Sequence, residues 1–191
     1  MSGRTGKVCP WWWGFSLLLP WRKWVQGQDP VKILGPYIKE GMTVLEPGPG
    51  MGYFTLEAAR LVGSEGRVVA VDLQPRMLQA LRRRAQQAGL LERIEIRQAK
   101  SDRELGIEDL QGKVDFILVF FMAHEVPDQD QFFRDLFRAA KPGCRFLIAE
   151  PPFHVKRKDF EATLVIAQSR GFKMDGPLPI QSSYSALLFK E

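Results

Sequence analysis

MTVLEPGPGMGYFT, residues 42–55, is the stretch that decides the fold of this 191-residue chain. Its apolar start, Met42–Leu45, predicts a short buried strand. An acid, Glu46, ends the apolar run. Three glycines then occupy alternate positions: Gly48, Gly50 and Gly52. A chain that turns sharply through glycine brings its backbone close to a ligand, because side chains with a Cβ atom would block that approach.

An amphipathic stretch follows the glycines and predicts a helix, with apolar residues at helical spacing from Phe54 to Val62. The glycine pattern is E-x-G-x-G-x-G, whereas a dinucleotide fold uses G-x-G-x-x-G to seat a pyrophosphate on the helix N-terminus. An acid at Glu46 would repel a diphosphate. The pattern therefore favours a ligand that carries a positive charge or an amino group.

Further strands and helices alternate along the rest of the chain. This alternation predicts one α/β domain with a doubly wound, mostly parallel sheet of seven strands. The last two strands should form a hairpin at one edge of the sheet, and Lys141-Pro142-Gly143 should form a turn. The expected strands are 42–45, 68–72, 93–97, 114–121, 144–149, 172–174 and 184–189, and the expected helices are 30–41, 52–61, 75–90, 105–110, 129–140 and 158–170.

A second acid, Asp72, ends the second predicted strand, and a carboxylate there can accept hydrogen bonds from the paired hydroxyls of a ribose. With Glu46 and the glycines, it resembles motif I and the following strand of the class I S-adenosylmethionine (SAM) dependent methyltransferases. The resemblance covers about residues 31–190 and is closest to the small type 11/type 25 members. It implies a Rossmann-like fold, SAM as cofactor and methyl transfer as the activity.

The resemblance also implies cofactor contacts. Glu46 and the loop backbone would hold the methionine part of SAM, Asp72 the ribose, and Leu73 with Phe120 the adenine. Many members carry an aspartate where this chain has Lys100, so Ser101 or the nearby backbone would meet the adenine edge. The full expected cofactor set is Glu46, Gly48, Pro49, Gly50, Tyr53, Asp72, Leu73, Lys100, Ser101 and Phe120.

The chain has two histidines, His124 and His154, and each follows a central predicted strand on the ligand side. Histidine exchanges protons near neutral pH, so His124 is the catalytic candidate, either as a proton acceptor or as a packed residue of the surrounding shell. The expected substrate contacts are Glu125, Glu150 and His154. No metal is expected, because the acids around His124 lack a metal-ligand spacing.

All five tryptophans lie between Trp11 and Trp24. Residues 1–28 are interpreted as a tryptophan-rich extension or lid, and residues 29–191 as the methyltransferase domain. Trp11, Trp12 and Trp13 are expected to line the substrate pocket; a peripheral membrane contact is the alternative, since tryptophan favours the interface. The apolar run is too short to span a bilayer, and no signal-peptide cleavage site follows it.

Composition sets wide bounds on function. The formal charge of +5 and a pI near 9.4 permit an anionic partner without requiring one. Two distant cysteines cannot form a disulfide framework, and neither sits where a cytosine- or uracil-C5 methyltransferase needs its nucleophile. We expect a cytoplasmic monomer or homodimer that methylates a small, partly apolar or aromatic molecule. The alternatives are an RNA or protein methyltransferase, motivated by the arginine run 82–84, and a non-catalytic SAM-binding or membrane-attached accessory protein.

Overall fold

The computed structural model describes residues 27–191, which form one seven-stranded sheet with helices on both faces. Trp11, Trp12 and Trp13 lie outside the described residues. The elements are α2 (Pro30–Leu34), β1 (Thr43–Pro47), α3 (Thr55–Leu61), β2 (Arg67–Asp72), α4 (Pro75–Gln87), η2 (Leu91–Arg93), β3 (Ile94–Gln98), η3 (Glu108–Leu110), β4 (Val114–Phe120), η4 (Ala123–Glu125), α5 (Gln129–Ala139), β5 (Ala140–Glu150), α6 (Arg157–Ser169), β6 (Lys173–Pro177) and β7 (Tyr184–Phe189).

The strand order is β3-β2-β1-β4-β5-β7-β6, and the expected doubly wound sheet is confirmed. Strands β1 to β5 are parallel, whereas β7 runs antiparallel to both β5 and β6. The order reverses between β1 and β4, which are direct neighbours. In open α/β sheets, ligands bind beyond the carboxyl ends of the strands at such a switch point.

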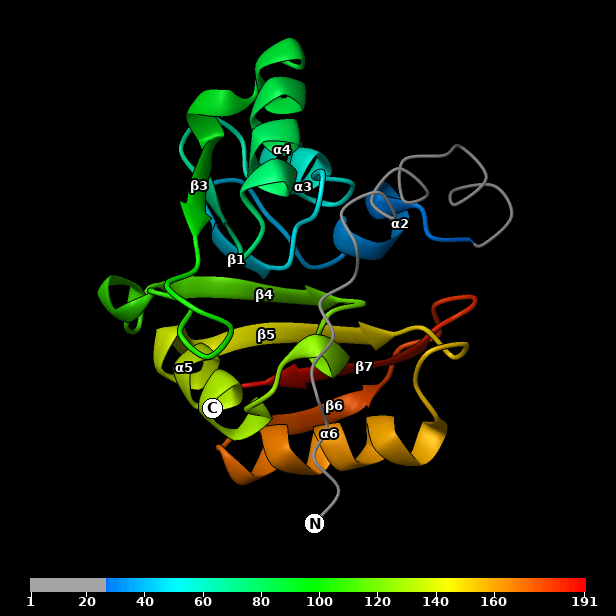
Figure 1. Cartoon of the computed structure of the whole chain (residues 1–191). Coiled ribbons are helices and arrows are strands. Elements are labelled where there is room, and N and C mark those ends of the chain that lie inside the picture. Colours follow the sequence, from blue (N-terminus) through cyan, green and yellow to red (C-terminus); the bar gives the residue numbers. More distant parts are fainter. Residues whose placement is uncertain (1–26) are drawn as a thin grey trace.

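The central strands are buried on both faces, which explains their nearly continuous apolar sequences. In β1, Val44 packs with α2, α3 and α4, while the next residue, Leu45, packs with α5 and α6. Figure 1 shows the two helix layers on opposite sides of the sheet. This arrangement leaves the ends of β1, β2, β4 and β5 as the place where polar residues can gather.

Three elements differ most from the sequence-based expectation, and the first is the helix expected over 105–110, of which only the three-residue 3₁₀ helix η3 forms. The first helix ends at Leu34 and does not reach residue 41, because Pro36 has no N–H to continue the helical hydrogen bonds beyond Gly35. Strand β5 begins at Ala140, so Lys141-Pro142-Gly143 is not a free turn. The β4–β5 register shifts there, and the proline and glycine lie in this irregularity of the ladder.

Candidate active site

Asp72, the last residue of β2, joins the glycine loop to the start of α4. Its Oδ2 accepts a hydrogen bond from the Gly50 N–H at 3.2 Å, and its Oδ1 accepts one from the Gln74 N–H at 2.8 Å. Burial raises the pKa of Asp72, and these backbone N–H groups oppose part of the rise. A carboxylate has about four acceptor positions, so Asp72 keeps capacity for the two hydroxyls of a ribose.

Glu46 lies one strand away, at the end of β1, and is only 3% exposed. Burial raises its pKa to about 7; the Thr55 hydroxyl opposes this rise and the Asp72 carboxylate adds to it. The Thr55 hydroxyl is close enough to act on the Glu46 carboxyl, but among the described residues Oε2 of Glu46 and Oγ1 of Thr55 meet no other hydrogen-bond partner. Buried polar atoms are nearly always paired, so these two mark a place that a polar ligand can complete.

The glycine loop packs tightly on its surroundings. The Gly48 N–H donates to the Val71 carbonyl at 2.8 Å, and a Cβ atom on Gly48 would lie 2.8 Å from Cγ of Met122. The φ angle of Gly48 is +70°, which glycine adopts without strain. The guanidinium of Arg84, on α4, donates to the Met51 carbonyl at 2.5 Å. The loop is therefore held from β2, from α4 and from the β4–η4 connection.

The hydrogen bond from Arg84 to the glycine loop was not predicted from the sequence, because Arg84 is one of three consecutive arginines that look equivalent. Its neighbours Arg82 and Arg83 are exposed, whereas Arg84 is partly buried and its pKa is lowered, chiefly by that burial. Helical spacing carries the only available signal: Arg84 is three residues after the buried Leu81 and shares its side of α4. The arginine run is therefore not a single solvated face.

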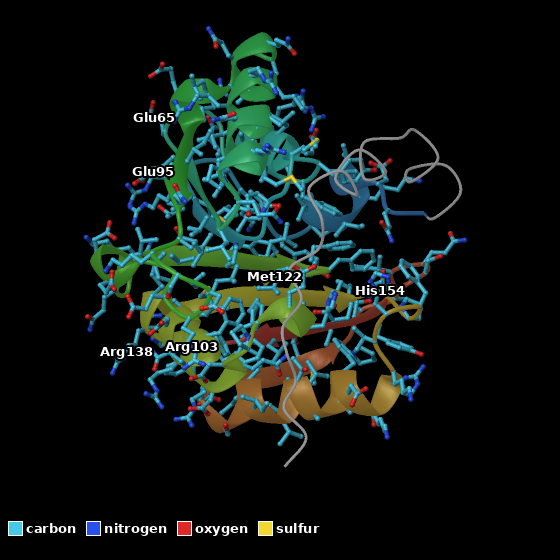
Figure 2. The ribbon with its side chains drawn as sticks, viewed as in Figure 1. Glu65, Glu95, Arg103, Met122, Arg138 and His154 are labelled. Atoms are coloured by element: carbon cyan, nitrogen blue, oxygen red, sulfur yellow. The ribbon has the colours of Figure 1, made fainter. Side chains whose placement is uncertain are left out.

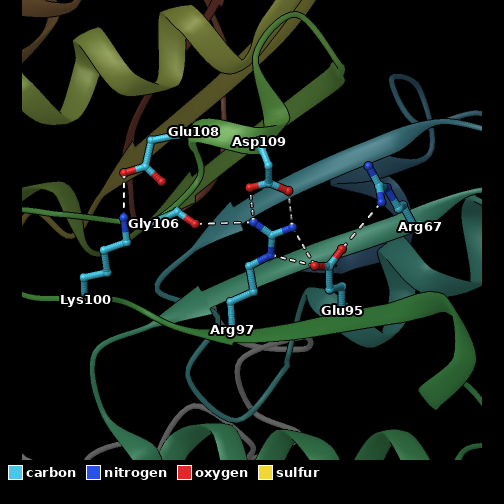
Figure 3. A network of polar contacts seen from close by, with 7 residues as sticks. All are labelled: Arg67, Glu95, Arg97, Lys100, Gly106, Glu108 and Asp109. Carbon is cyan, nitrogen blue, oxygen red and sulfur yellow. Dashed lines mark hydrogen bonds and ion pairs between the residues drawn. The ribbon is translucent and has the colours of Figure 1, made fainter.

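The loop after β3 carries Lys100 and Ser101, and a network of ion pairs ties it to the sheet edge (Figure 3). The Arg97 guanidinium makes two hydrogen bonds to the Asp109 carboxylate, at 2.6 and 2.8 Å, and a third to Glu95. Lys100 Nζ donates to Glu108 at 2.9 Å. The ammonium of Lys100 is thus engaged by an exposed acid within the same network. The hydroxyl of Ser101 accepts from the Arg103 N–H at 3.2 Å.

His124 and Glu150 form the tightest polar pair at the ends of β4 and β5. The ring Nδ1 of His124 lies 2.5 Å from Oε2 of Glu150, and the His124 backbone N–H donates to Oε1 at 3.1 Å. Glu150 is 1% exposed, whereas the His124 side chain is 23% exposed. The ring of His154 lies 6.0 Å from that of His124. Figure 2 shows Met122 and His154 toward the end of the sheet at which the β4 and β5 arrows point.

Competing effects set the pKa of His124. Burial would lower it, but the hydrogen bond to Glu150 and the charges of Glu150 and Glu125 outweigh burial, so the pKa is raised above its ordinary value. A histidine in this state is a stronger base than one in water, and its ring is held in one orientation. Glu125 follows His124 directly within η4.

A row of aromatic rings links the glycine loop to the β4 end. Tyr53 packs edge-on against Phe54, Phe54 lies 4.3 Å from Phe120, and Phe120 lies 4.5 Å from Phe121. Phe121 has a φ angle of +62°, an uncommon conformation for a bulky residue, and its N–H donates to the Ala149 carbonyl at 2.8 Å. The Tyr53 hydroxyl donates to the Gln28 carbonyl at 2.8 Å. These mutually tilted rings form a continuous aromatic row between the glycine loop and the end of β4.

Cys144 takes no part in this site. It lies near the start of β5 and is buried; burial raises the pKa of its thiol to about 12, and the Asp115 carboxylate adds to the rise. A thiol in this state is not a nucleophile at neutral pH.

Comparisons with known proteins agree with this geometry. Residues 38–172 match a family described as a methyltransferase domain. The curated ubiquinone/menaquinone biosynthesis C-methyltransferase UbiE of Escherichia coli K12 is 34% identical over 113 residues, which are 59% of this chain and 44% of UbiE. The chain therefore spans less than half the length of the curated relatives it matches.

Two solved structures extend the comparison. A SAM-dependent methyltransferase from Aquifex aeolicus superposes with a TM-score of 0.84 and 25% identity, over 96% of this chain and all of that one. A SAM-dependent O-methyltransferase from Thermotoga maritima superposes with a TM-score of 0.68 and 22% identity, over 85% of this chain and 64% of that one. At that identity the second likeness shows the fold alone.

Proposed function

Because the chain belongs to the methyltransferase domain family and is a SAM-dependent enzyme, we propose that it methylates a small, partly apolar or aromatic molecule. When bound, SAM supplies the methyl group, and its carbon–sulfur bond breaks with the electron pair left on sulfur. One observation carries the proposal. The acids that end β1 and β2 and the His124–Glu150 pair that follows β4 and β5 lie at the same edge of one sheet.

The residues at the ends of β1 and β2 fit a bound SAM. SAM is a cation with an amino group and a ribose, and it carries no phosphate. The unpartnered Oε2 of Glu46 suits a positive group, and Asp72 has acceptor capacity for two hydroxyls. We propose that these two acids and the glycine-loop backbone hold the cofactor, with Leu73 and Phe120 beside the adenine.

The remaining proposed cofactor contacts lie in the loop after β3 and in the glycine loop. The Lys100 ammonium is hydrogen-bonded to Glu108. We therefore assign the contact with the adenine edge to Ser101 and its neighbouring backbone in preference to the Lys100 side chain. Pro49 and Tyr53 belong to the glycine loop and its continuation. Tyr53 contributes through the aromatic row, and its hydroxyl is bonded to the Gln28 carbonyl.

We propose that the acceptor side is apolar with a few polar groups, which is the usual character of a small-molecule site. Phe121, whose ring contacts that of Phe120, would form its wall, and Phe153, in the loop after β5, is 66% exposed beside His154. A flat, partly apolar acceptor would stack on such a surface. We propose His124 as the catalytic residue, with Glu125 and His154 as substrate contacts at its rim.

The alternative of an RNA methyltransferase receives less support. The alternative rests on the arginine run 82–84, and the guanidinium of Arg84 is hydrogen-bonded to the Met51 carbonyl within the protein. A protein acceptor, a non-catalytic role and a membrane contact through the tryptophan segment stay open as outcomes of experiment. Within the part of the chain that the structure describes, no helix combines the length and the apolar character needed to cross a bilayer.

A screen with methyl-labelled SAM tests the proposal. Wild-type protein should label phenols, hydroquinones or related small aromatic acceptors, and should not label RNA or protein at comparable rates. His124→Asn should reduce turnover about 100-fold or more while it leaves the affinity for S-adenosylhomocysteine within about twofold, because a general base typically contributes that much to the rate. Labelling of RNA or protein alone, or full turnover by His124→Asn, would contradict the assignment.

A further inference from the structure

Glu150 and His124 come from different strand ends and meet through two hydrogen bonds. We propose that Glu150 is a positioning residue for His124 and that, in consequence, the methyl acceptor carries a proton on its nucleophilic atom. This inference rests on the proposed function and extends it, since it names the chemical class of the acceptor. This role replaces the direct substrate contact that the sequence predicts for Glu150.

Both carboxylate oxygens of Glu150 are hydrogen-bonded to His124. Its Oε2 meets the ring Nδ1 at 2.5 Å, and its Oε1 meets the backbone N–H of the same residue at 3.1 Å. The side chain is 1% exposed, so both oxygens are turned inward and toward one partner. Loss of this contact would leave an unpaired charge buried in the protein and would strongly destabilise the fold, so we expect the contact to persist.

The contact determines where the histidine proton sits. A carboxylate accepts hydrogen bonds and cannot donate them, so Nδ1 must carry the hydrogen and donate it to Oε2. In the neutral ring this leaves the lone pair on Nε2, at the side of the ring away from Glu150. A hydrogen bond at one ring nitrogen commonly fixes the tautomer in this way.

The surroundings of the ring keep it basic. Glu150 faces it from β5, Glu125 lies beside it in η4, and His154 approaches from the loop after β5. The two carboxylates stabilise the protonated ring, whereas a protonated His154 would oppose it. Nε2 is thus prepared to accept a proton and to hold it next to a buried negative charge.

A base of this kind is useful to only some acceptors. When the acceptor atom carries a hydrogen, its electron pair forms the new bond to carbon, and its proton passes to Nε2 and then to water. A hydroxyl, a thiol, a protonated nitrogen or an acidic C–H requires this step. A tertiary amine or a thioether has no proton to lose, and for such acceptors alignment alone would suffice. The pair therefore points to an acceptor of the first class.

Nuclear magnetic resonance on the full chain tests the positioning without any acceptor. Long-range ¹H–¹⁵N correlations of wild-type protein across pH 5–9 should show His124 with its proton on Nδ1. Glu150→Gln keeps the shape of the side chain but replaces one acceptor oxygen by an NH2 donor, so it should move the titration of His124 to lower pH and weaken the preference for a proton on Nδ1. Glu161→Gln, an exposed site on α6, is the matched control and should change neither property. A neutral wild-type ring with its proton on Nε2 would overturn the inference, and so would an unchanged titration of His124 in Glu150→Gln.

Kinetics then test the acceptor class. With phenol, thiol, tertiary-amine and thioether probes, only the first two should be methylated. Glu150→Gln should lower kcat about 10- to 100-fold, leave KM for SAM within about twofold, and shift the rising limb of the pH profile to lower pH.

The outcomes separate this inference from the proposed function. Methylation of the tertiary amine or thioether, unaffected by Glu150→Gln, would overturn the inference and leave small-molecule methylation standing. Absence of methyl transfer to every probe would contradict the proposed function, and the titration would still decide the role of Glu150. If Glu150→Gln lost its fold by circular dichroism, Glu150→Asp would replace it: the shorter chain keeps the charge but cannot reach both His124 contacts, so turnover should fall as well.

Discussion

Glu46→Gln should stabilise the protein without ligand while it weakens binding of SAM. Burial raises the pKa of Glu46 from 4.5 to about 7. Between these values the folded protein holds a proton that the unfolded chain has released, so stability falls as pH rises through this window and levels off above pH 7. The rise corresponds to about 3 kcal/mol lost at pH 8, at 1.36 kcal/mol for each pH unit. Glutamine has the same shape and carries no charge to bury, so the variant should avoid this loss.

Urea unfolding at pH 5 and pH 8 measures the effect. Wild-type protein should lose about 2–3 kcal/mol of unfolding free energy between the two values relative to Glu46→Gln. Glu65→Gln, at an exposed position between α3 and β2, is the control and should change stability by the same small amount at both. Although Glu46→Gln should be more stable than wild type at pH 8, its affinity for SAM at that pH should be about tenfold lower or more, because a carboxylate facing a cation is lost.

The refuting result is specific. If Glu46→Gln and wild type keep the same difference in stability at pH 5 and pH 8, Glu46 is not held protonated by its surroundings. If the variant binds SAM as tightly as wild type at pH 8, the carboxylate does not face the cationic part of the cofactor. The second result would remove Glu46 from the cofactor site.

Two further substitutions test the glycine loop. Gly52→Ala should destabilise the fold by about 2–4 kcal/mol, since φ is +84° there and the new Cβ would lie 2.4 Å from Cδ1 of Leu81; an unchanged thermal midpoint would contradict this packing. Arg84→Ala should weaken binding of S-adenosylhomocysteine roughly tenfold in calorimetry because the Met51 carbonyl loses its charged donor, whereas the exposed neighbour Arg83→Ala should not, and equal effects would refute a special role for Arg84.

The sequence predicted the sheet and the cofactor end of the site because both depend on local pattern. The strand, acid and glycine succession of residues 42–55 appears in the structure as β1 followed by a loop with positive φ at Gly48, Gly50 and Gly52. Apolar runs located the strands to within a few residues. The start of β5 was missed because Ala140 pairs with Val114 on another strand, and that pairing overrides the turn preference of Pro142-Gly143.

The polar contacts of the site could not be predicted in the same way. His124 and Glu150 are 26 residues apart, and the sequence placed each at a strand end without showing that they bond to each other. The positions of Thr55 beside Glu46 and of Arg84 beside the Met51 carbonyl were missed, because burial and hydrogen bonding depend on the packing of α3 and α4 around the loop. From the sequence we could predict only that these groups lie at the same edge of the sheet.

The central claim is that SAM binds where β1 and β2 end, with Asp72 on its ribose. Isothermal calorimetry with S-adenosylhomocysteine on wild type and Asp72→Ala tests it most directly. Loss of two hydrogen bonds to a carboxylate should cost about 2–4 kcal/mol, which is roughly a 30- to 1,000-fold weaker Kd, while circular dichroism shows the fold retained. Equal affinity in a folded Asp72→Ala protein would contradict the account.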